Sequence, residues 1–336
     1  MICSRAPTRI SFAGGGTDIP EIAMYIDGCV TSVAISRYVF ASLKPRRDKR
    51  TKICYIKMDG TQTMLDMPAS RIIYDGRLDL IKSVVDELGH GSGFDIVVTS
   101  EVPEHSGLGA SASAYAALIA LFNAYDSLGM GKKDIAELAF RLETEKLKNR
   151  VGKQDQYAAC FGGLNFIEFS KDMNVRISPI KSTEKTIQGL EKNLALFYIA
   201  KREKAAGDVI SAQAKNFRDK KNAMRGFLMT KELGMRAKTS LEKNNLREFG
   251  KVMGLVWKYK KKFSPETTTP LIERMHKMAL ANGAYGGKIS GAGSGGCGFW
   301  FCREGTKNKV IKSLETMRAK RLDFSFDYEG VKTWEI

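Results

Sequence analysis

The chain of 336 residues has little of what metal-binding, disulfide-bonded or membrane proteins need. Its three histidines, His90, His105 and His276, are far apart and none is followed by a ligand-type residue three or four positions later, so zinc chemistry is not expected. Six cysteines are scattered without a CxxC pair, which is typical of reduced thiols in a cytosolic protein. The longest apolar stretch, near 112–125, is shorter than a membrane span and the N-terminus lacks a signal-peptide core, so the sequence predicts a cytoplasmic protein.

Proline is also scarce, at 8 residues, and no proline- or serine-rich linker separates the two halves of the chain. Acidic residues are outnumbered, because 54 Lys and Arg stand against 37 Asp and Glu, a formal net charge of +17. Such a surplus admits nucleic acid, anionic lipid or phosphorylated metabolites as partners. The basic runs at 44–52, 201–204, 215–225 and 258–262 lack the motifs of nucleic-acid readers. We therefore interpret them mainly as solvated surface and expect neither a nucleic-acid nor a membrane partner.

The pattern of apolar residues predicts an α+β protein. Strands are expected at 2–12, 28–34, 38–44, 51–57, 94–100 and 195–200, after 162–163, after the glycine-rich segment 286–298, and at the C-terminal end. Helices are expected at 81–87, 112–127, 132–147, 207–238, 241–263, 269–281 and 307–321. The change from strand-rich to helix-rich texture places a soft domain boundary near 170–182.

Three segments are rich in glycine: 14–16, 107–113 and 291–298. The middle one leads into an alanine-rich helix, and a helix N-terminus presents unpaired N–H groups and the positive end of the helix dipole to an anion. Gly107 and Gly109 would let the main chain approach a phosphate, while Ser111 and Ser113 offer hydroxyls to phosphate or Mg²⁺. The pattern is equally compatible with a plain helix cap by Ser111, and with ligand-free turns in the other two segments. The sequence has no Walker A loop and no GxGxxG turn.

Phosphoryl transfer also needs a group that orients or deprotonates the attacking hydroxyl, and oxygen ligands for a divalent cation. Asp155, at a loop-to-helix junction, is a candidate for the first role, and Glu143, on the preceding helix, is a candidate for the second. Position alone leaves two alternatives open: Asp155 as a helix N-cap, and Glu143 as a solvated carboxylate on a helix face.

Three segments resemble the motifs of the GHMP superfamily, which includes galactokinase, homoserine kinase, mevalonate kinase and phosphomevalonate kinase. They are APTRISFAGGGTD at 6–18, PEHSGLGASAS at 103–113 and KISGAGSGG at 288–296, and they follow the family's order across the whole chain. Within the superfamily, the combination of AGGGTD, GKQDQYAA, TTTP and GGKISGAG is similar to the sugar-1-kinase branch that contains D-glycero-D-manno-heptose 7-phosphate kinases and related fucokinase domains.

This resemblance implies a fold and a reaction. The expected fold is a GHMP kinase fold, with an N-terminal ribosomal-S5-like, ATP-binding domain at 1–175, a C-terminal ferredoxin-like domain at 176–336, and the active site in the cleft between them. The expected reaction uses ATP and Mg²⁺ to phosphorylate the anomeric hydroxyl of a sugar.

The resemblance also implies roles for individual residues. Asp155 would be the catalytic base or orienting group, and Arg9 would lie beside it and the transferred phosphate. Ser111 and Glu143 would hold Mg²⁺. The implied nucleotide-binding residues are Pro103, Ser106, Gly107, Leu108, Gly109, Ala110, Ser111, Ala112 and Ser113. The implied substrate-binding residues are Gly14, Gly15, Gly16, Thr17, Asp18, Gly291, Ala292, Gly293 and Ser294.

Two motifs depart from the family pattern. The second usually reads GLGSS, and Ala110 replaces its first serine, which removes one possible phosphate contact. The third usually reads GAGGGG, and Ser294 and Cys297 are substitutions that alter its turn. Neither change affects Asp155 or Ser111, so the expected activity stands.

The leading hypothesis for the substrate is D-glycero-D-manno-heptose 7-phosphate, phosphorylated at C1 to the 1,7-bisphosphate. A phosphorylated substrate would also use part of the basic surplus, with Lys153, Lys201 and Arg202 as candidate contacts. One alternative is a kinase of an unphosphorylated sugar such as L-fucose. Another, of a different class, is a non-catalytic polyanion-binding regulator on the same fold. The sequence does not distinguish a monomer from a homodimer.

Overall fold

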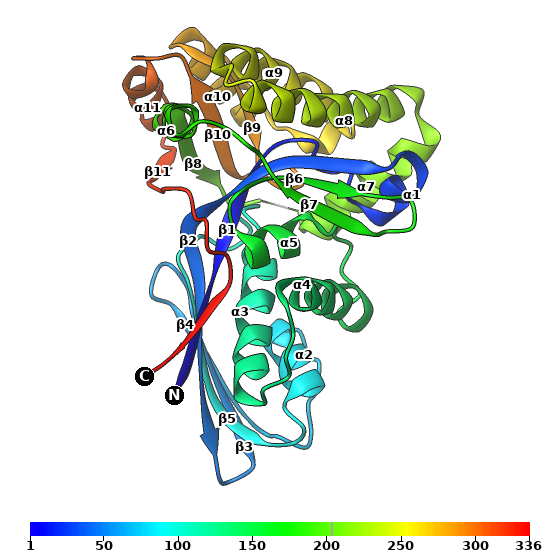
Figure 1. Ribbon diagram of the computed structural model, residues 1–336, viewed down its shortest axis with the longest axis vertical. Coiled ribbons are helices and arrows are strands. Elements are labelled where there is room, and N and C mark those ends of the chain that lie inside the picture. The colour runs from blue at the N-terminus through cyan, green and yellow to red at the C-terminus, as the bar shows by residue number, and fades with distance from the viewer. Residues whose placement is uncertain (203) are drawn as a thin grey trace.

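Two β-sheets follow one another along the long axis of the protein, which a computed structural model describes over residues 1–202 and 204–336 (Figure 1). Over these ranges the larger sheet has the order β12-β1-β2-β5-β3-β4, with β6 beside β2 and β7 beside β6. Its strands are β1 (Ile2–Ala13), β2 (Gly28–Arg46), β3 (Arg50–Ile56), β4 (Gln62–Pro68), β5 (Gly93–Ser100), β6 (Leu164–Phe169), β7 (Val175–Pro179) and β12 (Lys332–Glu335). The smaller sheet has the order β11-β8-β10-β9, formed by β11 (Lys320–Leu322), β8 (Leu194–Ala200), β10 (Gly296–Cys302) and β9 (Ala284–Ile289). The predicted α+β class is confirmed.

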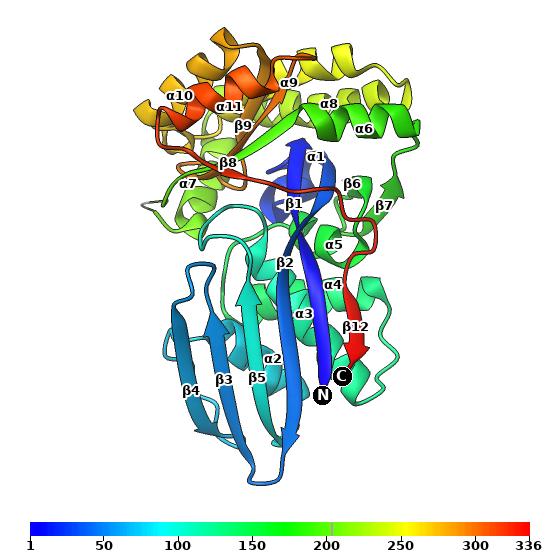
Figure 2. The same cartoon turned by 90° about the vertical axis from the view of Figure 1, so that its left-hand side faces the viewer.

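Strand β2 is the longest strand of the larger sheet, and it was wrongly predicted as two strands at 28–34 and 38–44. It runs without a break from Gly28 to Arg46. It pairs with β1 between Thr31 and Leu43, with β5 at its C-terminal half and with β6 at its N-terminal half. Register shifts at Pro7/Thr8 and Ser11/Ala13 interrupt the ladder on the β1 side, which is how β-bulges bend a strand. The C-terminal end of β1 therefore reaches the level where the two sheets meet (Figure 2).

One face of the larger sheet carries four helices: α2 (Asp79–Leu88), α3 (Ala110–Tyr125), α4 (Lys132–Arg141) and α5 (Gln154–Phe161) (Figure 2). Helix α3 is buried on all sides over 112–122, because it contacts β1 and β2 on one side and α2, α4 and α5 on the others. Its alanines favour a helix and keep its surface small enough for close packing against the sheet. The N-terminus of α3 is thereby held firmly in place.

The remaining helices of the described residues lie mainly in the second half of the chain, and several of them pack on the smaller sheet. They are α6 (Glu184–Asn193), α7 (Ala206–Asp219), α8 (Lys221–Glu242), α9 (Leu246–Lys260), α10 (Pro270–Ala281) and α11 (Lys307–Glu315), while α1 (Pro20–Ile26) follows the first glycine-rich loop. Helix α9 packs on β9, and α8 packs on both α9 and β2 of the larger sheet. Helix α8 therefore bridges the two halves of the molecule.

Several predicted element boundaries were wrong for local reasons. The expected helix 207–238 is interrupted at Lys220, whose extended backbone (φ −128°, ψ 113°) separates α7 from α8. The expected helix 132–147 ends in a π-helical turn, Leu142–Lys146, and the helix expected at 307–321 stops at Glu315, so that Lys320–Leu322 can form β11. Elements α1, β4, β7, α6 and β9 were not predicted, and a single last strand was predicted where β11 and β12 form.

An apolar core joins the two halves. The ring of Phe12 on β1 lies edge-on to Phe249 of α9, at 5.3 Å between centroids, and to Phe299 of β10, at 6.0 Å. All three are fully buried, so the cluster fixes the end of β1 against the smaller sheet.

The two ends of the chain lie side by side (Figure 1), and β12 returns from the second half to pair with β1. The division into 1–175 and 176–336 stays a prediction. No helix among the described residues combines the length and apolarity needed to cross a bilayer.

Candidate active site

The three glycine-rich segments meet at one cavity between the two halves. Its lining includes Gly15, Gly16 and Asp18 after β1; Ser106, Gly107, Gly109, Ala110, Ser111 and Ala112 at the start of α3; Glu143; Gln154, Asp155 and Gln156 of α5; Arg202; Lys260 of α9; and Gly291 and Ala292 before β10. Residues almost 300 positions apart in sequence thus share one site.

The loop into α3 is shaped by glycine. Gly107 and Gly109 have φ of 75° and 83°, and a Cβ on Gly107 would lie 2.6 Å from the carbonyl oxygen of Ser290. The N-cap of α3 is Gly109, which makes no side-chain cap, and Ser111 is exposed and lines the cavity. The alternative that Ser111 caps the helix is therefore wrong, and Ala110, Ser111 and Ala112 of the first turn of α3 line the cavity, where the N–H groups of a helix N-terminus can bind an anion.

Three residues of the predicted nucleotide loop do not line the cavity. Ser113 is buried, and its hydroxyl donates to the carbonyl oxygen of Pro7 at 2.8 Å, which ties α3 to β1. Leu108 is fully buried in the core, and Pro103 lies outside the cavity lining. Leu108 and Ser113 therefore anchor the loop to the core and to β1.

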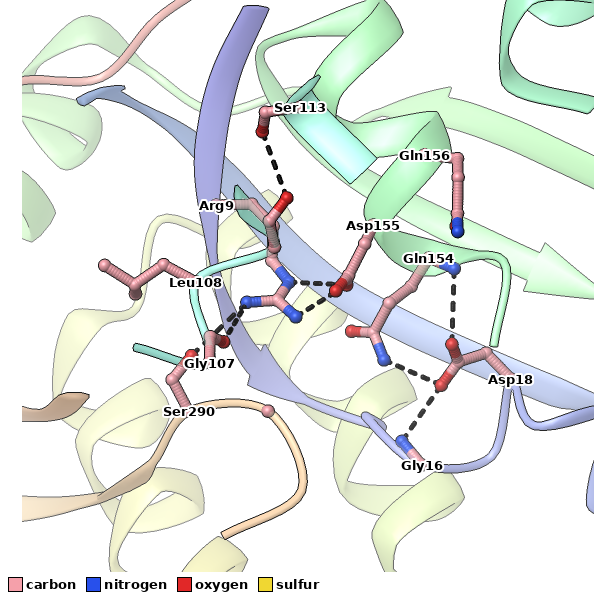
Figure 3. A network of polar contacts seen from close by, with 12 residues as sticks. Arg9, Gly16, Asp18, Gly107, Leu108, Ser113, Gln154, Asp155, Gln156 and Ser290 are labelled. Atoms are coloured by element: carbon pink, nitrogen blue, oxygen red, sulfur yellow. Dashed lines mark hydrogen bonds and ion pairs between the residues drawn. The ribbon is translucent and has the colours of Figure 1, made fainter. Parts of the chain in front are cut away.

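A single buried guanidinium connects the parts of the site. Arg9 on β1 donates from Nε to Oδ1 of Asp155 at 2.8 Å, and its Nη2 forms an ion pair with the same oxygen at 2.6 Å (Figure 3). Its Nη1 donates to the carbonyl oxygen of Gly107 at 2.6 Å and to the hydroxyl of Ser290 at 3.4 Å. The side chain of Arg9 is 3% exposed and that of Asp155 is 27% exposed. The N-cap of α5 is Lys153, so the alternative that Asp155 caps this helix is wrong.

Asp18 is fixed by the segment that carries Asp155. Its carboxylate accepts from the backbone N–H of Gly16 at 3.0 Å, and from the backbone N–H and the Nε2 of Gln154 at 3.2 and 2.7 Å (Figure 3). Burial, and secondarily the charge of Asp155, raise the pKa of Asp18. Asp18 lines the cavity together with Gly15 and Gly16.

Four residues of the predicted substrate-binding set do not line the cavity. The hydroxyl of Thr17 donates to the carbonyl oxygen of Gly14 at 2.8 Å and accepts from the backbone N–H of Cys29 at 3.0 Å, so Thr17 and Gly14 close the turn itself. Gly293 and Ser294 face residue Thr267, whose carbonyl oxygen accepts from the backbone N–H of Ser294 at 2.9 Å.

Glu143 is buried, so the alternative of a solvated carboxylate on a helix face is wrong. It lies in the π-helical turn Leu142–Lys146, is 5% exposed, and accepts from Nε2 of Gln156 at 2.9 Å. Burial, with a further contribution from the charge of Asp155, raises the pKa of Glu143 to about 7. The Oε1 of Gln156 is buried without a hydrogen-bond partner among the described residues.

These oxygens fit a divalent cation that is shared with a phosphate. No group of three His, Cys, Asp or Glu side chains that could hold a metal occurs among residues 1–202 and 204–336. Magnesium usually takes one or two protein carboxylates, several waters and phosphate oxygens, so one buried carboxylate with a nearby hydroxyl is a suitable donor set. Glu143 and Ser111 both line the cavity and could supply these donors.

A second, mainly apolar cavity adjoins the first. It is lined by Val39, Tyr55, Leu78, Leu80, Ile81, Val98 and Ala114, with Ser100 and Glu104, and it shares His105, Ala110 and Ser111 with the first cavity. An apolar pocket that leads past a helix N-terminus into a charged cavity suits a molecule with a flat aromatic group and a phosphate tail. Sequence reasoning missed this pocket, because its residues are spread over β2, β3, α2 and β5 without a motif.

The three candidate contacts for a substrate phosphate lie in different surroundings. Lys153 is buried, and its ammonium donates to both carboxylate oxygens of Glu137, at 2.9 and 2.7 Å, outside the cavity. Lys201 is exposed and does not line the cavity, whereas Arg202 is buried and does. Glu203, within the basic segment 201–204, lies outside the described residues.

Comparisons with known proteins agree with this geometry. The GHMP kinases N terminal domain matches residues 78–163, and the GHMP kinases C terminal matches residues 237–319. A D-glycero-alpha-D-manno-heptose 7-phosphate kinase of Campylobacter jejuni is 33% identical over 100% of this chain and 99% of that protein. The chain belongs to the GHMP kinase family.

Further relatives support the same fold. A D-glycero-D-manno-heptose 1-phosphate kinase from Bacteroides thetaiotaomicron has a crystal structure with a TM-score of 0.82 and 25% identity, covering 100% of this chain and 99% of that one. The L-fucokinase/L-fucose-1-P guanylyltransferase of Bacteroides fragilis is 22% identical over 95% of this chain and 36% of that protein. GHMP kinases are ATP-dependent phosphotransferases, and this GHMP kinase is therefore an enzyme of that kind.

Sequence reasoning also missed several polar groups that shape the site of this GHMP kinase. Gln154 and Gln156 flank Asp155, and they hold Asp18 and Glu143. Lys260 reaches the cavity from a helix more than 100 residues away. The two glutamines could have been predicted, because both belong to the GKQDQYAA segment that carries Asp155. Lys260 could not, because it belongs to a basic run that we interpreted as solvated surface.

Proposed function

We propose that this GHMP kinase transfers the γ-phosphoryl group of ATP to the anomeric C1 hydroxyl of a sugar phosphate, with D-glycero-D-manno-heptose 7-phosphate as the substrate. The observation that carries the proposal is the Asp155 carboxylate, held by Arg9 beside the open N-terminus of α3. The choice of sugar is supported by the similarity, over the full length, to a heptose 7-phosphate kinase.

In this proposal, different parts of the cavity bind the nucleoside, bind the phosphates and activate the attacking hydroxyl. The nucleoside of ATP would occupy the apolar cavity, and its phosphates would extend past Ala110 and Ser111 to the first turn of α3, where N–H groups and the helix dipole stabilise negative charge. Asp155 would accept the proton of the attacking hydroxyl, or orient that hydroxyl, while Arg9 keeps the carboxylate in place and stabilises charge on the transferred group.

The sugar and the metal would be held by the remaining groups. Asp18, fixed by Gln154, presents its carboxylate to the cavity and can accept hydrogen bonds from sugar hydroxyls. Glu143 and Ser111 would hold Mg²⁺, which neutralises charge on the ATP phosphates.

A substrate screen tests the proposal. Purified protein is incubated with ATP and Mg²⁺ and, in turn, with D-glycero-D-manno-heptose 7-phosphate, L-fucose, galactose and mevalonate. We expect the highest kcat/KM with the heptose 7-phosphate. Turnover of mevalonate alone would overturn the sugar-kinase assignment, and L-fucose as the best substrate would favour the alternative suggested by the similarity to a fucokinase domain.

We expect Gly152→Ala to disable the sugar-binding side of the site. A Cβ on Gly152 would lie 1.9 Å from Oδ2 of Asp18, so the carboxylate would have to leave its position. The expected result is a rise in KM for the sugar on the order of 10-fold or more, with the KM for ATP nearly unchanged. Gly207→Ala is the matched control, because its Cβ would meet no atom within 4 Å. Equal KM values in both variants would contradict a substrate contact by Asp18.

A further inference from the structure

The guanidinium of Arg202 is buried, but two of its nitrogens have no hydrogen-bond partner among the described residues. Arg202 follows β8, is only 5% exposed, and lines the cavity. Its Nε and Nη2 are buried without a hydrogen-bond partner among residues 1–202 and 204–336. An arginine offers five N–H donors, and a buried cation without a partner is strongly destabilising, so proteins rarely retain one unless an anion joins it.

The position of Arg202 points to the same cavity as the candidate catalytic groups. A Cβ built on Gly107 would lie 3.1 Å from Nη2 of Arg202, so this nitrogen is next to the loop that leads into α3. Gly107 is also the residue whose carbonyl oxygen accepts from Arg9. Arg9 and Arg202 therefore flank one loop residue, and within residues 1–202 and 204–336 Arg9 pairs with a carboxylate whereas Arg202 does not.

Lys260 places a second cation on the same wall. It is 3% exposed, lines the cavity from the end of α9, and donates to the carbonyl oxygen of Gly291. Burial, followed by the charges of Arg9 and Arg202, lowers the pKa of Lys260 to about 7. Lys288 is also buried, and burial, followed by the charge of Lys260, lowers the pKa of Lys288 well below its usual range. Arg202 and Lys260 both line the cavity, so the two cations face a common space.

We propose that Arg202 and Lys260 form a phosphate-binding site on the wall of the cavity that the second half of the chain contributes, additional to the N-terminus of α3. A phosphate dianion would supply the acceptors that Arg202 lacks and would offset the repulsion among the buried cations. This inference rests on the proposed function, since either reactant can bring the phosphate: the sugar phosphate through its own phosphate, or ATP through its terminal one. The chemistry of recognition is the same in both cases.

Binding of inorganic phosphate tests the site without any assumption about the sugar. The dissociation constant is measured by calorimetry in the absence of nucleotide for the wild type, Arg202→Gln, Lys260→Met and the control Arg225→Gln, in which an exposed arginine of α8 is changed. We expect each of the first two substitutions to weaken phosphate binding 10-fold or more, and the control to bind as the wild type does. Wild-type affinity in Arg202→Gln, or no phosphate binding by the wild type, would overturn the proposal.

Thermal stability separates a ligand-binding role of Arg202 from a structural one. Arg202→Met removes a buried charge and keeps much of the side-chain volume, so we expect it to melt at a higher temperature than the wild type without phosphate and to gain less when phosphate is added. A lower melting temperature with an unchanged response to phosphate would show that Arg202 only supports the fold. Arg202→Lys retains the charge and provides a folded variant if the neutral ones do not accumulate.

Steady-state kinetics then identify the source of the phosphate. If the sugar carries it, Arg202→Gln raises the KM for the sugar phosphate 10-fold or more and leaves the KM for ATP and the turnover of unphosphorylated sugars unchanged. If ATP carries it, the KM for ATP rises with every sugar. If the KM for the sugar phosphate and the KM for ATP were both unchanged, the proposed phosphate-binding site would be contradicted. If instead the substrate screen contradicted the proposed function, the measured binding of inorganic phosphate would still stand.

Discussion

Asp155→Asn is expected to lower kcat by a factor on the order of 10² or more and to leave the affinity for ATP nearly unchanged. Asn retains the size of the side chain but can neither accept a proton at neutral pH nor carry the charge that pairs with Arg9. The nucleotide contacts proposed at the start of α3 do not include Asp155, so ATP binding, measured by calorimetry, should persist. Activity equal to that of the wild type would mean that the carboxylate only positions Arg9.

The control for this substitution must also break an ion pair of a buried cation. Glu137→Gln does so, because Glu137 accepts from the buried Lys153 and from the hydroxyl of Tyr157 on α5, outside the cavity. We expect this variant to lose stability but to keep its kcat. A large fall in kcat for Glu137→Gln would indicate that any disturbance of α5 stops turnover, and the effect of Asp155→Asn would then not identify a base.

Elements with a strong local pattern could be predicted from the sequence. The alanine-rich run after Gly109 predicted a helix, and α3 occupies Ala110–Tyr125. The apolar residues of 2–12 predicted the strand that became β1. Strand β4 was missed because it is an edge strand with mostly exposed side chains, so burial leaves little pattern in its sequence.

Only those parts of the candidate site that belong to a recognisable motif could be predicted from the sequence. The glycine-rich loops and Asp155 stand in recognisable segments, and the structure brings them to one cavity. The predicted basic contacts show the limit of this reasoning, because Lys153, Lys201 and Arg202 are equivalent as charges in a sequence. One of them pairs with Glu137, one faces solvent, and one enters the cavity, and only tertiary packing decides which.

A local irregularity of the helix places Glu143, the candidate metal ligand, at the cavity. An α-helix continued through 142–146 would place side chains on the 3.6-residue period, whereas the π-helical turn inserts an extra residue into the turn and changes the direction of those that follow. Such turns are frequent at functional sites. The sequence gives no sign of this turn, and this is why a solvated carboxylate was an open alternative for Glu143.

We expect Glu143→Gln to raise the Mg²⁺ concentration required for half-maximal velocity by a factor on the order of 10 or more at saturating ATP, because Gln lacks the charge that a divalent cation prefers. The same substitution removes a buried carboxyl group whose raised pKa shows that its charge is poorly tolerated. Without Mg²⁺ and nucleotide, the variant should therefore melt at a higher temperature than the wild type. Titration of velocity with Mg²⁺ and a thermal melt measure the two effects.

The opposite signs of these effects distinguish a metal ligand from a structural residue. A purely structural Glu143, bonded to Gln156, would lose stability on substitution and leave the Mg²⁺ requirement unchanged. Glu145→Gln is the matched control, since Glu145 lies in the same π-helical turn, is exposed, and does not line the cavity. It should change neither quantity. A variant of Glu143 that is less stable and has a wild-type Mg²⁺ requirement would remove Glu143 from the proposed metal site and leave Ser111 as its only protein donor.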